Sequence, residues 1–137
     1  MSFALTTEQI KNHTKTVTRR LGWANLKPGE RFLAVEKCMG LKKGEKHKVL
    51  AELECVSNRP ECIGDMNAVP FSYGENETKL EGFPEMTGAE FVEMFSRKMK
   101  INPVVGWVNR IEFKYVGAER DRDREFAEAF NIWARTR

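Results

Sequence analysis

The sequence has little cysteine, little histidine and no long hydrophobic run. No apolar stretch approaches the roughly 20 residues that cross a bilayer, and the first residues, MSFALTTEQ, lack the layout of a signal peptide. We therefore expect a cytoplasmic protein with no membrane partner. The three cysteines, Cys38, Cys55 and Cys62, form no regular framework, which indicates reduced thiols. A zinc site that they form with His47 is the weaker alternative, because no CxxC or HxxxH pair is present.

Motifs of the commoner enzyme classes are also missing. The sequence contains no Walker phosphate loop, no dinucleotide fingerprint, no HExxH and no GxSxG. We expect neither a cofactor nor a metal. What the chain does contain is 137 residues, 41% of them apolar and 31% charged, which is typical of one globular domain.

Charge is distributed unevenly along the chain. Residues 1–50 hold eleven Lys and Arg against four Asp and Glu, whereas residues 51–93 hold two against ten. Two interpretations fit this asymmetry equally well. Either a basic face binds a polyanion such as RNA, or the opposite charges pair within the fold.

Hydrophobic periodicity and capping residues predict a strand-rich chain with two internal helices and a third at its end. Thr6 with Gln9 and Thr87 with Glu90 fit capping boxes that open the first two helices. Residues 58–79 are rich in Pro, Gly and Asn, which indicates a long loop. The expected strands cover residues 2–5, 15–20, 31–38, 48–57 and 104–116.

This order of elements favours an α+β fold, a small and mostly antiparallel β-barrel with helices at its seams. Leu33 and Trp107 fall at apolar positions of expected strands, and we expect both to pack inward. The predicted core further contains Phe32, Val35, Leu53, Phe91, Phe95, Ile111 and Phe113.

Residues 13–20, HTKTVTRR, resemble the signature of the ASCH family, which runs Gly, Lys, an acidic or hydroxyl residue, and Arg. Lys15, Thr18 and Arg20 match this signature, and His13 stands at the glycine position. The segments EGFPEMT and WVNRIEF resemble the acidic turn and the closing strand of phage and bacterial ASCH proteins. The match covers roughly residues 2–116 and leaves the tail outside.

The resemblance implies a PUA-like barrel over residues 1–117, with a cleft beside the first helix for RNA or a modified nucleoside. The helical pattern of residues 118–137 indicates an extension that packs on the domain or joins two copies in a homodimer. Some ASCH proteins are amidohydrolases that remove the acetyl group of acetylated cytidine with a Lys, a Thr and a Glu. Others have been described as ribonucleases. Lys15 and Thr18 match the first two roles, and Glu81 or Glu85 the third.

The spacing of Lys15 and Thr18 sets a geometric condition on catalysis. Residues three apart on a regular strand point to opposite faces, so the chain must bulge there or turn between helix and strand. Lys15 could then act as a base for the Thr18 hydroxyl if burial, or the charges of Arg19 and Arg20, lowered its pKa. Without that change Lys15 is a ligand for phosphate or carbonyl.

Four other residues are candidates for ligand contacts. Arg19 and Arg20 would bind phosphate, and Trp23 is either a platform for base stacking or a core residue. His13 either acts as a general base or caps the end of a helix. The leading hypothesis is an RNA- or nucleotide-binding module, the alternative is a nucleoside amidohydrolase or ribonuclease, and the third is a protein-interaction surface.

Overall fold

The computed structural model describes residues 1–37, 44 and 48–117. The expected C-terminal extension over residues 118–137 lies outside these residues, together with the homodimer contact assigned to it. Cys38 and His47 lie outside them as well.

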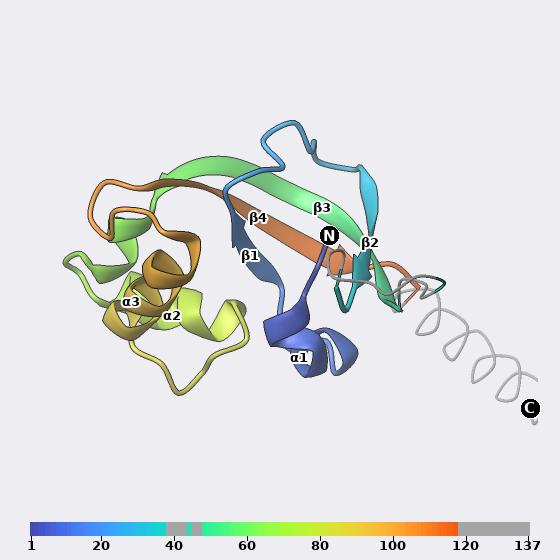
Figure 1. Ribbon diagram of the computed structural model, residues 1–137, viewed down its shortest axis with the longest axis horizontal. Helices are drawn as coiled ribbons and strands as arrows, with labels where there is room; N and C mark the ends of the chain where they lie inside the picture. Colours follow the sequence, from blue (N-terminus) through green and yellow to red (C-terminus); the bar gives the residue numbers. More distant parts are fainter. Residues whose placement is uncertain (38–43, 45–47, 118–137) are drawn as a thin grey trace, which may run out of the picture.

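Four antiparallel strands form the sheet, in the order β1-β4-β3-β2. The sheet curls into a half-barrel (Figure 1), which confirms the expected α+β class with a small barrel-like sheet. Its outermost strand β1 pairs on one side with β4. The strands are β1 (Val17–Arg20), β2 (Arg31–Val35), β3 (Val49–Cys62) and β4 (Trp107–Tyr115).

The long strand β3 holds the sheet together. Its first half pairs with β2, and it pairs with β4 from Leu53 to Cys62. The register with β4 shifts between Cys55 and Ser57, which marks a bulge. A bulge bends a strand and increases its twist. β3 can therefore follow the curl of the sheet while it pairs with both β2 and β4.

Short helices flank the sheet. Figure 1 shows α2 with α3 at one end of it and α1 below it, near the start of β1. Helix α3 opens with the expected capping box, in which the Thr87 hydroxyl accepts from the Glu90 N–H and the Glu90 carboxylate accepts from the Thr87 N–H. The helical elements are η1 (Ala4–Thr6), α1 (Thr7–Lys11), η2 (Ile63–Asn67), α2 (Ser72–Leu80) and α3 (Gly88–Met99).

The core consists of two apolar clusters. One lies inside the half-barrel around Phe3, Leu53 and Phe113, and the other joins η2, α3 and β4 around Met66 and Phe91. All seven predicted core residues are buried.

Two predictions about inward packing are wrong. Leu33 is exposed because it alternates with the buried Phe32 and Ala34 on β2. Trp107 is 68% exposed, since it opens β4 and pairs with Cys62, the last residue of β3. A residue at the end of two paired strands has few neighbours to cover it.

Three predicted elements also differ from the structure. The long loop over residues 58–79 is instead the end of β3, then η2 and α2. The Thr6 side chain makes no capping bond, and the Gln9 amide donates to the Gly82 carbonyl instead. Residues 2–5 contribute a single bridge, between Ser2 and Val35, and then η1.

Candidate functional site

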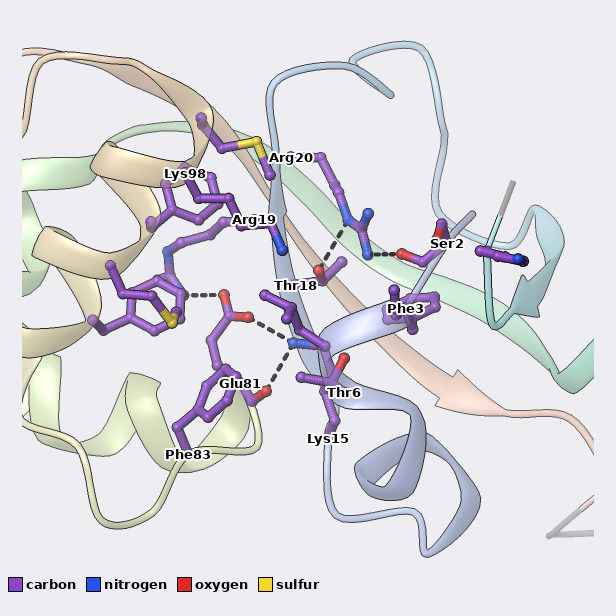
Figure 2. Close-up of a pocket in the computed structure, with 17 residues that line it drawn as sticks. Ser2, Phe3, Thr6, Lys15, Thr18, Arg19, Arg20, Glu81, Phe83 and Lys98 are labelled. Atoms are coloured by element: carbon purple, nitrogen blue, oxygen red, sulfur yellow. Dashed lines mark hydrogen bonds and ion pairs between the residues drawn. The ribbon is translucent and has the colours of Figure 1, made fainter. Parts of the chain in front are cut away.

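A pocket of about 500 Å³ opens beside β1. The N-terminal segment forms one wall, α3 forms the other, and the turn after α2 closes the lower side (Figure 2). Apolar side chains, four of them phenylalanines, make up about half of the lining residues. They are Phe3, Ala4, Leu5, Phe83, Phe91, Met94, Phe95 and Met99.

Lys15 and Thr18 both line this pocket, and the local backbone explains how. β1 begins only at Val17, so Lys15 precedes the strand and escapes its alternation. The Thr16 N–H donates to the Leu80 carbonyl, and the Lys15 carbonyl accepts from the Tyr115 hydroxyl at 2.6 Å. The turn between helix and strand therefore meets the geometric condition for a shared pocket.

His13 has an unusual backbone conformation for a residue with a side chain. Its φ of 62° lies in the left-handed region, which glycine adopts at the least cost. The imidazole stacks on the Tyr115 ring, with centroids 4.0 Å apart, and is exposed. His13 is not part of the pocket wall, so it supports the turn before Lys15.

Lys15 and Glu81 form a buried pair on the wall of the pocket. The Lys15 Nζ donates to Glu81 Oε1 at 2.7 Å and to the Glu81 carbonyl at 2.8 Å. Both side chains are 3% exposed. Burial lowers the pKa of Lys15 below its ordinary value, although Glu81 opposes this shift. The arrangement favours a lysine that can lose its proton more readily than one in water.

The turn after α2 fixes Glu81 in place. Gly82 follows with a φ of 96°, a conformation that side chains rarely adopt. A Cβ at Gly82 would lie 2.9 Å from the Gln9 Cγ, because α1 packs directly against this turn. Glu85 is exposed and does not line the pocket. Of the two carboxylates considered, Glu81 is the one beside Lys15.

Arg19 joins Glu81 to two further carboxylates. Its guanidinium lies 3.0 Å from Glu81 Oε2, 3.0 Å from Glu61 Oε1 and 2.5 Å from Glu77 Oε1. The Arg19 side chain is fully buried. Burial works to lower the pKa of Arg19, but the three carboxylates outweigh it and raise that pKa. With its donors engaged, Arg19 in this state presents no free face to a phosphate.

Four members of this network carry no recognisable sequence motif. Arg110 pairs with Glu77, and the Tyr73 hydroxyl donates to Glu61 at 2.7 Å. Burial tends to raise the pKa of Glu77, but hydrogen bonds from the two arginines bring it below its usual value. The uneven charge of the sequence was the available signal. These contacts agree with the second interpretation of the uneven charge, in which basic and acidic segments pair within the fold.

Thr18 contacts Arg20 instead of Lys15. The Arg20 Nε donates to Thr18 Oγ1 at 3.2 Å, and its Nη2 donates to the Ser2 carbonyl at 2.5 Å. The guanidinium also lies over the Phe3 ring, 4.7 Å from its centroid. Figure 2 shows these contacts on one side of β1 and Glu81 on the other. Thr18 and Glu81 nevertheless line the same pocket.

Trp23 lies away from the pocket. Its side chain is 43% exposed, its φ is 70°, and its ring is tilted against Phe32 with centroids 6.1 Å apart. It is not part of the pocket wall. Trp23 is therefore a separate surface residue and not a core residue.

Two observations concern metals and membranes. Cys55 is buried and Cys62 is half-buried, and both are free thiols. Within the described ranges, no group of three or more His, Cys, Asp or Glu is placed to hold a metal ion. No helix in those ranges is long and apolar enough to cross a membrane.

Comparison with known proteins supports the fold alone. No family model matches the chain, and no curated protein is significantly similar to it. A crystal structure of protein EF3133 from Enterococcus faecalis V583, described as family DUF984, aligns with a TM-score of 0.50 at 15% identity. The alignment covers 82% of this chain and 70% of that one. The likeness agrees with the α+β fold and its curled antiparallel sheet.

Proposed function

We propose that this chain is a cytoplasmic ASCH protein whose pocket binds the base of a modified nucleoside. The observation that carries the proposal is the buried Lys15–Glu81 pair on the wall of an aromatic pocket. Aromatic side chains favour a flat apolar ring, and a few buried polar groups orient it. The volume of about 500 Å³ lies within the usual range for small-molecule sites.

The charges of the site favour a small ligand over an RNA backbone. Lys15 and Arg19, which the sequence offered as phosphate ligands, are buried against Glu81, Glu61 and Glu77. A phosphate could reach either cation only by breaking a buried ion pair, which is strongly unfavourable. We therefore assign the pocket to a base and not to a polyanion.

Calorimetric titration with cytidine and N4-acetylcytidine tests this assignment. Phe95→Ala, which removes part of the aromatic wall, should weaken binding by about tenfold or more, as expected for a lost stacking contact. Lys11→Met is the matched control, since Lys11 is an exposed lysine on α1 that pairs with Glu8. If the wild-type protein binds neither nucleoside, the proposal is wrong and the protein-interaction hypothesis gains weight.

A second candidate function is hydrolysis of an acyl group on the bound base. Lys15, Thr18 and Glu81 share the pocket, and burial lowers the pKa of the lysine. In this reaction neutral Lys15 takes the Thr18 proton, and Oγ1 attacks the acetyl carbonyl. The C–N bond breaks, the base leaves with that proton, and water then hydrolyses the acyl-threonine to acetate. Glu81 holds the Lys15 nitrogen in place.

Chromatographic detection of cytidine released from N4-acetylcytidine tests the reaction. Thr18→Ala should abolish release while nucleoside binding persists, whereas Thr18→Ser should keep part of the activity because it keeps a hydroxyl. Undiminished release by Thr18→Ala would rule out the threonine as nucleophile. If the wild-type protein releases no cytidine, the hydrolysis hypothesis is wrong and the pocket remains a candidate binding site.

A further inference from the structure

We infer that the ligand of this pocket is a nucleoside monophosphate, with its phosphate at Lys98. The inference rests on the proposed function, because it presumes that a base occupies the aromatic part of the pocket. It assigns the other end of the pocket to an anionic group.

The charges that line the pocket are mostly positive. Among the described residues, five cationic side chains line it against a single carboxylate, that of Glu81. Glu81 already pairs with Lys15 and Arg19, so it does not offset the remaining cations. The other lining cations are Arg20, which contacts Thr18 and Ser2, and Lys37 and Lys98.

Lys98 is the cation best placed for a ligand. It lies seven residues after Phe91 and three after Phe95, so it shares their side of α3. It is exposed, and no ion pair joins it to another residue of the described ranges. Its neighbour Arg97, by contrast, pairs with Glu93 at 2.9 Å. A lysine that lines an apolar pocket and has no ion pair among the described residues can bind an anion.

The positions of the groups match the parts of a nucleotide. In Figure 2, Lys98 lies toward the Arg20 end of the pocket and Lys15 toward the opposite end, with Glu81 and Thr18 between them. A base that reaches Lys15 and Glu81 would direct its sugar toward Lys98. A phosphate on that sugar would then meet Lys98, with Arg20 and Lys37 adding positive potential.

Calorimetry with cytidine and cytidine 5′-monophosphate tests the inference, since neither ligand carries a group that the proposed reaction would consume. The monophosphate should bind the wild-type protein about tenfold more tightly, as expected for one charge-assisted contact. Lys98→Ala should remove most of that gain and leave cytidine affinity unchanged. Lys100→Asn is the control, because Lys100 lies outside the pocket wall and Asn tolerates its left-handed conformation.

Each outcome separates the inference from the proposed function. Equal affinity for the two ligands would overturn the inference and leave the base-binding proposal standing. A phosphate gain that persists in Lys98→Ala would overturn the assignment to Lys98. If neither ligand binds, the inference fails, and the titration with N4-acetylcytidine decides the proposed function separately. High salt should reduce the gain from the phosphate and not the affinity for cytidine, because screening acts on the charged contact.

Discussion

Replacement of Arg19 by methionine should lower the free energy of unfolding by about 3–5 kcal/mol, the usual effect of removing one partner from a buried ion pair. The Arg19 side chain is fully buried and contacts Glu61, Glu77 and Glu81 within 3.0 Å. Methionine fills similar space without a charge, so it leaves these carboxylates short of a partner. The loss is a large fraction of the stability of an ordinary domain.

The assay is urea unfolding of the wild type and Arg19→Met, followed by circular dichroism at pH 7 and pH 5. Carboxylates that lose a buried cation have raised pKa values in the folded state. A raised folded-state pKa makes stability increase as pH falls, so the deficit should be smaller at pH 5. Arg31→Met is the control. Arg31 is 47% exposed and lies 3.4 Å from Glu54, so we expect a loss of about 0–1 kcal/mol. If Arg19→Met also lost only about 0–1 kcal/mol of unfolding free energy, the reasoning would be refuted.

Three further predictions concern the pocket and its turn. Gly82→Ala should destabilise the fold by about 1–3 kcal/mol, because φ is 96° and α1 packs against the turn; urea unfolding measures the loss, and an unchanged midpoint would contradict it. Hydrolysis of N4-acetylcytidine should accelerate with pH and level off below pH 10.5, since burial lowers the pKa of Lys15 from that value; a pH-independent rate over this range would exclude Lys15 as base. Trp23→Ala should leave the calorimetric affinity for cytidine unchanged, because Trp23 lies outside the pocket wall; a marked loss would move the base to Trp23.

The parts of the fold that local sequence predicted well are those with strong local signals. The Thr87 capping box and the spacing of Phe91 and Phe95 define α3, which forms as expected. Alternation along β2 and β4 identified buried residues correctly except at Leu33 and Trp107. Such signals depend on neighbours in the sequence, so no tertiary information is needed to find them.

The segment over residues 58–79 shows what local sequence cannot reveal. Pro60 suggested a loop, yet it lies in β3 opposite Asn109, beyond the stretch that pairs with β2. Proline is tolerated where one side of a strand has no partner. Gly74 weakens the helical signal of α2, but a Cβ there would collide with the Met66 carbonyl. Both elements depend on distant partners.

The family resemblance suggested Lys15, Thr18 and Glu81, but nothing in the sequence suggested Glu61, Glu77 and Arg110, which complete the network around Arg19. Glu77 sits on a helix of mostly polar residues, where a carboxylate is ordinarily solvated. Its burial depends on Arg19 and Arg110, which are distant in sequence. The separation of positive and negative segments indicated that pairing was possible. It did not identify which residues would pair.

The most direct test of the account is a crystal structure of the protein with cytidine 5′-monophosphate. We predict the base against the aromatic wall of α3 near Phe91 and Phe95, with a polar atom of the ring within hydrogen-bond distance of Lys15 or Glu81. The phosphate should lie beside Lys98. A base stacked on Trp23 with the pocket vacant would contradict the central claim.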